Sequence, residues 1–295
     1  MNRLHPDIEE LLNCSDTERI KKVEDSKWIG YPRAKKILDK LEDLLIHPKT
    51  LRMPNLLLVG DTNNGKTILV NRFNKIHEPR ITADDERLNR NVVLIQAPHK
   101  PDERMFYNSL LDSLYVPYKF NDRVEKKQQQ VIQLFSHIGV KMLIIDEIHH
   151  ILAGSAMAQR TFLNMIKYLA NELQIVIVGA GIKDAFNVIN SDPQLANRFE
   201  PAVLPKWTMN DEYLRLLASF EYVLPLKEGS NLSDQEIASK ILLLSQGTIG
   251  EISTVIRKAA KSAIKSKTER ITLKVLNNID YIPPSERRSQ INLVG

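Results

Sequence analysis

The sequence predicts an α/β fold in which a parallel β-sheet, flanked by helices, is followed by a small C-terminal α-helical lid subdomain. Short apolar runs alternate with helical patterns through the first two thirds of the chain. Near-continuous apolar strands separated by helices are typical of a parallel sheet that is buried on both faces. After Pro205 the apolar runs stop and only helical patterns continue. The 295 residues therefore fit one large domain with a subdomain.

The segment before the first strand contains two predicted helices. A short helix is expected over Asp7–Leu12, and a polar, charged stretch follows at Ser15–Lys27. The segment Ile29–Leu45 has apolar residues at helical spacing and a proline near its start, which predicts an amphipathic helix that leads into the core.

The core elements then follow in order. The predicted strands are Asn55–Val59, Val92–Ala97, Met142–Asp146, Ile175–Gly179 and Ala202–Leu204. Helical patterns between them begin near Gly65, Pro101, Arg123, Ala156 and Ile182.

The last third of the chain predicts four helices, Met209–Phe220, Ser233–Ser245, Gly250–Lys265 and Leu273–Ile279. Ser233, followed by Glu236, and Thr272 have the residue types that cap helix N-termini. The expected organisation is an N-terminal extension (1–28), an α/β nucleotide-binding core (29–206), a helical lid (207–285) and a C-terminal tail (286–295).

The segment GDTNNGKT matches the phosphate-binding pattern G-x-x-x-x-G-K-S/T between a predicted strand and a predicted helix. Glycines let backbone N–H groups close around phosphate oxygens, and a helix N-terminus adds a positive dipole. Lys66 would bridge the β- and γ-phosphates, and the Thr67 hydroxyl would coordinate Mg²⁺. The alternative is an ordinary strand-to-helix turn. The predicted nucleotide contacts here are Gly60, Asp61, Thr62, Asn63, Asn64, Gly65, Lys66, Thr67 and Ile68.

A second acidic element supports ATP hydrolysis. The apolar strand KMLIID ends in Asp146 and is followed by Glu147. Asp146 would hold Mg²⁺ through water, and Glu147 would orient and deprotonate the attacking water, a base that a mere nucleotide binder does not need. His149 and His150 follow, and a metal site is one interpretation. Adjacent helical residues point in different directions, which favours a surface or packing role.

Charge and composition limit the remaining possibilities. The net charge of +5 is concentrated in residues 251–295, which hold nine Lys or Arg and four Asp or Glu. This is compatible with a nucleic-acid partner or with a solvated helix face. The single cysteine, the absence of a long apolar run and the absence of a signal-peptide pattern lead us to expect a cytoplasmic protein with no membrane partner.

Five segments together resemble the AAA+ ATPases and, more narrowly, the TniB transposition ATPases, which are relatives of TnsC. They are WIGYPRAKKILDKLEDLL, NLLLVGDTNNGKT, MLIIDEIHHILAGSAMAQRTFLN, LQIVIVGAGIKDAF and DPQLANRFEPAVLPKW. The resemblance implies an ATP-dependent DNA-binding regulator that forms rings or helical filaments on double-stranded DNA. It would connect a target-selection protein to a DDE-type transposase.

The family places ATP between subunits, and Arg198 matches the arginine that completes a neighbour's site; the alternative is a helix-end arginine. Tyr31 and Arg33 lie in the region that lines the adenine pocket of related ATPases, although Tyr31 could simply pack. Gln96 would restrain the catalytic Glu147 or would be only a polar strand end.

The sequence departs from the wider AAA+ pattern at two positions. Gly179, Ala180 and Gly181 stand where a polar sensor residue is common, and Gly247–Glu251 lacks a sensor arginine. We expect slow, assembly-dependent hydrolysis.

Family resemblance also places DNA contacts between the second and third strands. The candidates are Lys100, Lys119, Arg123, Lys126 and Lys127, and they would contact phosphates without reading sequence. A charged loop without a partner is the alternative. The helical stripe Arg257, Lys261 and Lys265 would contact DNA or transposase, or would be a solvated lid face.

Two other functions share these features. An initiator-like or clamp-loader-like DNA-remodelling ATPase would use the same core, but the sequence shows no appended DNA-reading domain. A non-hydrolysing, nucleotide-gated adaptor would not need Glu147.

Overall fold

The computed structural model describes residues 4–25, 28–79 and 89–291, and residues 288–291 by their backbone only. The chain divides into two compact units. One, called the α/β unit below, comprises Arg33–Asp61 and Lys66–Leu204; the other, called the helical unit, comprises Met1–Pro32, Thr62–Gly65 and Pro205–Gly295. The boundaries of the four predicted regions stay predictions, and the end of the predicted tail, 292–295, lies outside the described residues.

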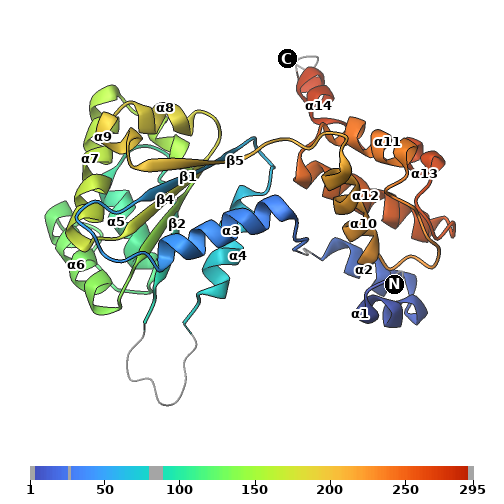
Figure 1. Ribbon diagram of the computed structural model, residues 1–295, viewed down its shortest axis with the longest axis horizontal. Helices are drawn as coiled ribbons and strands as arrows, with labels where there is room; N and C mark the ends of the chain where they lie inside the picture. Colours follow the sequence, from blue (N-terminus) through green and yellow to red (C-terminus); the bar gives the residue numbers. More distant parts are fainter. Residues whose placement is uncertain (1–3, 26–27, 80–88, 292–295) are drawn as a thin grey trace. The chain divides into compact units, whose positions relative to one another are not determined.

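The α/β unit is built on a five-stranded parallel sheet with the order β2-β3-β4-β1-β5 (Figure 1). Its strands are β1 (Asn55–Gly60), β2 (Val92–Gln96), β3 (Met142–Asp146), β4 (Val176–Gly181) and β5 (Phe199–Leu204). Every residue of β1, β3 and β4 is buried, as expected of strands covered on both faces. The predicted fold class is therefore confirmed, with each strand within three residues of its expected bounds.

Helices cover both faces of this sheet. They are α3 (Pro32–Leu45), α4 (Lys66–Ile76), α5 (Glu103–Ser113), α6 (Val124–His137), α7 (Ala156–Leu173), α8 (Ala185–Asn190) and α9 (Pro193–Ala196), with the 3₁₀ helix η2 (Ile148–Ala153) after β3. Alternate strand residues such as Leu57, Val93 and Leu143 share one core with Phe106 of α5 and Phe162 of α7. Figure 1 shows α5, α6 and α7 gathered on one side of the sheet, while α4 contacts β1–β4.

The parallel topology separates two sets of residues along the strands. Gly60, Asp146 and Gly181 end β1, β3 and β4, so they lie at the carboxyl edge of the sheet, where ligands bind in open α/β sheets. Arg198 directly precedes β5, and Phe199 pairs with Asn55 at the opposite, amino edge. The sheet therefore fixes which predicted site residues can meet within one chain.

The helical unit is packed around α12 (Ile249–Lys265), whose apolar face includes the buried Ile252, Val255 and Ala259. Its other elements are α1 (Pro6–Glu9), η1 (Glu10–Asn13), α2 (Asp16–Glu24), α10 (Asp211–Tyr222), α11 (Gln235–Ser245), α13 (Leu273–Asn278) and α14 (Pro284–Ile291). Helices α2, α11 and α13 all contact α12. Across the described ranges, none of the helices has both the length and the apolar character that a membrane crossing requires.

Helix capping in this unit corrects the sequence analysis at two places. The N-cap of α11 is Asp234, whose carboxylate accepts from Glu236 N and Ile237 N, and not Ser233 as predicted. The stretch Ser15–Lys27 contains the helix α2, which a reciprocal capping box between Ser15 and Glu18 begins. The prediction of Thr272 as the N-cap of α13 is confirmed.

Candidate functional site

In the α/β unit, Lys66 is the first residue of α4 and reaches back to the end of β1. Its Nζ donates to Gly60 O at 2.9 Å and to Asp61 O at 2.8 Å, and the residue is 5% exposed. Burial lowers the pKa of Lys66, although the carboxylates of Glu147, Asp146 and Asp61 oppose this shift. A cationic group thus lies at the carboxyl edge of the sheet, beside three carboxylates.

The loop residues between Asp61 and Lys66 are held by the first turn of α12 within the helical unit. Gly250 N donates to Asn63 O at 3.0 Å, and Asn64 Nδ2 donates to Pro205 O at 3.2 Å. Asn63 and Gly65 have φ values of 58° and 85°, the left-handed region that Gly and Asn tolerate best. This backbone requirement explains the glycine of the motif at position 65.

Thr67 and Asp146 form the second polar pair at this edge. Thr67 Oγ1 donates to Asp146 Oδ2 at 2.7 Å, and Asp146 Oδ1 accepts from Glu147 N at 2.9 Å. A hydroxyl and a carboxylate that lie this close supply the oxygen ligands that Mg²⁺ prefers. The residues present therefore fit the predicted metal.

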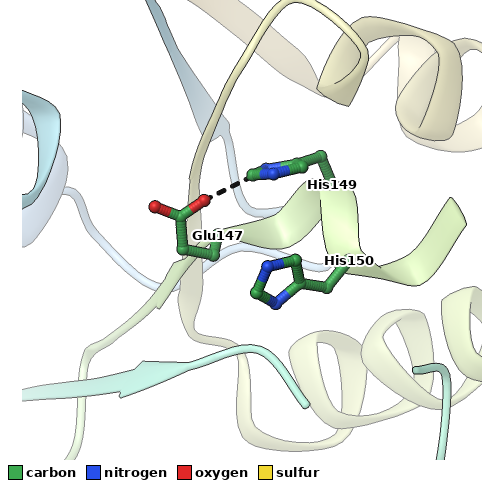
Figure 2. Close-up of side chains that lie close together, drawn as sticks. All are labelled: Glu147, His149 and His150. Carbon is green, nitrogen blue, oxygen red and sulfur yellow. Dashed lines mark ion pairs between the residues drawn. The ribbon is translucent and has the colours of Figure 1, made fainter. Parts of the chain in front are cut away.

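Glu147 and His149 contact each other directly after β3. His149 Nδ1 lies 3.3 Å from Glu147 Oε2, within ion-pair distance but without hydrogen-bond geometry (Figure 2). Burial lowers the pKa of His149, and nearby His150 and Lys66 lower it further, against the carboxylates of Glu147 and Asp184.

The glycines at the end of β4 make room for this histidine. A Cβ on Gly181 would lie 3.2 Å from His149 Nδ1, and one on Gly179 would lie 2.9 Å from Ile148 Cδ1. The glycines that stand in place of a polar sensor residue thus let η2 pack closely against β4, and His149 lies beside Glu147 as a result. The contact between Glu147 and His149 was not predicted from the sequence, in which the small residues of VGAG are its only signal.

Arg198 lies at the amino edge of the same sheet. Its Nη1 donates to Asn171 Oδ1 at 2.8 Å, and its backbone carbonyl accepts from Asn55 N at 2.9 Å. The side chain lines a surface pocket of about 920 Å³ together with Arg52, His47 and Leu51 of the segment after α3. The strand rise of about 3.3 Å per residue over β1 puts roughly 16 Å between the two edges of the sheet.

The structure does not test the remaining predicted nucleotide contacts, and one of them packs against another side chain. Tyr31 is 9% exposed, and its ring meets Trp207 edge-on at 5.1 Å within the helical unit, as the packing alternative expects. Arg33 is half-buried near the start of α3, Thr62 is exposed, and Ile68 is 53% exposed. Their contacts with a nucleotide stay predictions.

Gln96 likewise stays a prediction. It ends β2 opposite Asp146 of β3 and is exposed.

The predicted DNA-contacting residues separate into two groups. Lys100, Lys119 and Arg123 are exposed, and exposed Lys126 pairs with Asp122 at 3.0 Å. The prediction that Lys127 contacts DNA is wrong, because the residue is buried.

Lys127 is fully buried, and its Nζ donates to Asn108 Oδ1 at 2.7 Å and to Phe120 O at 3.0 Å. It also lies over the Tyr118 ring, 4.8 Å from the centroid. This ammonium holds the turn before α6 and is not available to a phosphate.

The helical unit also assigns partners to other basic residues. Arg257 and Lys261 of the helical stripe pair with Glu24 of α2 at 3.8 Å and 3.3 Å, which favours the solvated-face alternative. Glu251, at the position without a sensor arginine, accepts from Arg287 Nη1 at 3.0 Å and Tyr281 Oη at 2.6 Å. Asn63 Nδ2 donates to the same carboxylate at 3.1 Å, so the loop is tied to this cluster.

Comparison with known proteins identifies the family. The model of the family described as Bacterial TniB protein matches residues 19–209. The ATP-binding subunit ClpL of the ATP-dependent Clp protease of Lactococcus lactis subsp. lactis is 29% identical over 171 residues, 56% of this chain and 20% of ClpL. The chaperone protein ClpB of Meiothermus ruber is 25% identical over 199 residues, 66% of this chain and 22% of ClpB. The chain thus spans about a fifth of the length of these relatives.

Solved structures agree in fold. The Aeropyrum pernix ORC1 protein in complex with DNA has a TM-score of 0.63 at 18% identity, covering 92% of this chain and 69% of that one. The ORC2 protein of the same organism gives 0.62 at 15% identity, with 91% and 74% covered. Domain III of Thermotoga maritima DnaA gives 0.52 at 16% identity, with 92% and 95% covered. At such identities these likenesses carry the fold alone, and they confirm an AAA+ α/β fold.

Proposed function

The chain belongs to the bacterial TniB family, and from that premise we propose that it is an ATP-dependent regulator of transposition that assembles on double-stranded DNA. Assembly takes the form of a ring or helical filament. The assembled protein links a target-selection protein to a DDE-type transposase. Slow hydrolysis of ATP at the subunit interfaces controls how long the assembly persists.

In this proposal one subunit supplies the residues that hold ATP and the base, and a neighbouring subunit supplies an arginine. The Lys66 ammonium and the backbone amides of Gly60–Thr67 hold the ATP phosphates, because both present positive charge at a helix N-terminus. Thr67 and Asp146 are the residues that would hold Mg²⁺, which offsets phosphate charge when bound. Glu147 accepts the proton of the attacking water. A neighbouring subunit supplies Arg198.

The observation that carries the proposal is the separation of Arg198 from the other site residues. Lys66, Thr67, Asp146 and Glu147 cluster at the carboxyl edge of the sheet, while Arg198 precedes β5 at the amino edge. Arg198 is therefore unable to reach the phosphates bound by its own chain. A permanently charged fork in a surface pocket suits phosphate oxygens of a neighbour.

Electron microscopy of the protein with ATP, Mg²⁺ and duplex DNA tests assembly, and ATP turnover under the same conditions tests hydrolysis. Replacing Glu147→Gln removes the base, and we expect turnover to fall by about 10²-fold or more while the rings or filaments become longer-lived. A wild-type protein that stays monomeric with ATP and DNA would contradict the proposal. So would a Glu147→Gln protein that hydrolyses ATP at the wild-type rate.

A further inference from the structure

Three side chains with metal-binding atoms converge where β3 ends. Glu147, His149 and His150 each offer one ligand atom, and these atoms all lie within 4.8 Å of one another. Figure 2 shows the Glu147 carboxylate beside the His149 ring, with the His150 ring below them. The sequence alone favours a surface or packing role for the histidines, because adjacent residues of an α-helix point in different directions.

The local backbone explains the convergence. The segment after β3 is a 3₁₀ helix, in which residues three apart eclipse, and His150 N donates to Glu147 O at 2.9 Å. Glu147 itself has a φ of 54°, a left-handed conformation that is unfavourable for a non-glycine residue. Backbone strain of this kind is concentrated at functional sites.

The ring nitrogens of both histidines are also placed to bind a metal ion. His149 Nδ1 is a buried nitrogen without a hydrogen-bond partner among the described residues. His150 Nδ1 lies 3.5 Å from Ala97 O, so a proton on Nδ1 leaves Nε2 as the ligand, the arrangement in which a backbone carbonyl orients a ligating histidine.

The donor set selects the class of ion. Two imidazoles and one carboxylate suit Zn²⁺ and its spectroscopic substitute Co²⁺, whereas Mg²⁺ prefers the oxygen pair Thr67 and Asp146. The carboxylates of Glu147 and Asp184 add negative charge around His149, and the Lys66 ammonium opposes it.

We propose that Glu147, His149 and His150 bind a divalent transition-metal ion of the zinc class, and that this ion blocks ATP hydrolysis by occupying the Glu147 carboxylate. The blocking step rests on the proposed function, because it requires Glu147 to be the base. The metal site does not, because its ligands are set by the fold. Zinc thereby holds the nucleotide-loaded state.

Titration of the untagged, nucleotide-free full chain with Co²⁺ tests the site directly. We expect visible d–d absorption bands of a low-coordinate Co²⁺ with nitrogen ligands, which Zn²⁺ removes by competition. His149→Ala and His150→Ala should each weaken Co²⁺ binding by at least about tenfold. His137→Ala, which removes an exposed histidine at the end of α6, is the matched control and should bind as the wild type does.

Absence of Co²⁺ bands in the wild type overturns the proposal, as does unchanged binding by His150→Ala. Circular dichroism identifies a variant that has not folded, and His150→Gln, which keeps a side chain of similar size, then replaces it. Zn²⁺ added at saturating Mg²⁺ should lower ATP turnover without lowering the binding of a fluorescent ATP analogue. Turnover that Zn²⁺ leaves unchanged in a Co²⁺-binding protein overturns the blocking step. A protein that binds Co²⁺ but hydrolyses no ATP even in the absence of Zn²⁺ would contradict only the proposed function, and the metal site would stand.

Discussion

At the residue scale, the phosphate loop is shaped by its contact with the start of α12. Gly250 N donates to Asn63 O, and a Cβ on Gly250 would lie 1.9 Å from Asn63 Oδ1. Asn63 also donates to Glu251, which Arg287 and Tyr281 hold in place. A glycine outside the phosphate-binding motif therefore leaves room for the side chain of a loop residue.

Gly250→Ala should weaken ATP binding by about tenfold or more. Helix propensity alone favours Ala over Gly by about 1 kcal/mol, so without the steric conflict the substitution would stabilise α12. The added methyl group displaces the Asn63 side chain and breaks its hydrogen bond to Glu251, and we expect the loop to lose that support. Binding of a fluorescent ATP analogue measures the effect, and Ser253→Ala, in the first turns of the same helix, is the control. Unchanged affinity in Gly250→Ala would show that the loop adapts.

Single residues also show what the sequence could predict. Lys66, Thr67 and Asp146 were predicted because their types and spacing are set by the chemistry of phosphate binding, and the structure brings the last two within 2.7 Å. Lys127 was misplaced because charge alone does not reveal burial. His149 was missed as a partner of Glu147 because that contact requires the 3₁₀ turn and the small Gly181.

At the element scale, α2 is fixed to the rest of the helical unit by a buried arginine. Arg19 is 1% exposed, donates through Nη1 to Glu269 Oε1 at 3.0 Å and through Nε to Pro225 O at 3.1 Å. The hydrogen bond from Arg19 is the main cause that lowers the pKa of Glu269. Because the carboxylate is stabilised in the folded protein, this pair stabilises the unit only while Glu269 is ionised.

Glu269→Gln should therefore destabilise the helical unit at pH 7 by about 3 kcal/mol, the usual cost of removing one partner of a buried pair. The unfolded carboxyl group has the higher pKa, so it binds the extra proton as the pH falls. The contribution is complete above about pH 4.5 and is lost as the pH falls through the lower pKa of the folded protein.

Urea unfolding at neutral and acidic pH measures this difference, which should shrink towards acid. The exposed pair Arg270–Glu228 of the same unit provides the control, and Glu228→Gln should have a much smaller effect. A difference between wild type and Glu269→Gln that does not change with pH would contradict the assignment.

Helices and strands were predictable where their own residues show a clear apolar periodicity. The strands and α12 have unambiguous apolar periods, so their bounds agree with the sequence to within a few residues. The helix α2 has only two buried residues, Arg19 and Val23, and so lacked an apolar stripe. Its helical start was nevertheless encoded by Ser15 and Glu18, a capping signal that the charged composition concealed.

At the scale of the whole molecule, the sheet topology separates the predicted site residues into two groups. The order β2-β3-β4-β1-β5 places the carboxylates of Asp146 and Glu147 on the same edge as Lys66 and leaves Arg198 on the other. From the sequence, only family resemblance assigns Arg198 to a neighbour's site. The strand register now supplies an independent physical reason. The central claim is that hydrolysis requires residues from two chains.

Mixing two inactive variants tests this claim most directly. Glu147→Gln disables the phosphate site by removing its base but keeps assembly and Arg198, and Arg198→Ala keeps the phosphate site but loses the arginine. Each should be inactive alone, and Arg52→Ala, from the same pocket as Arg198, controls for general damage there.

ATP turnover of the equimolar mixture on DNA is the measurement. Random pairing places an intact phosphate site against an intact Arg198 at about a quarter of head-to-tail interfaces, so the mixture should recover up to about that share of wild-type turnover. A mixture as inactive as its components, or an Arg198→Ala protein that is fully active alone, would contradict the shared site.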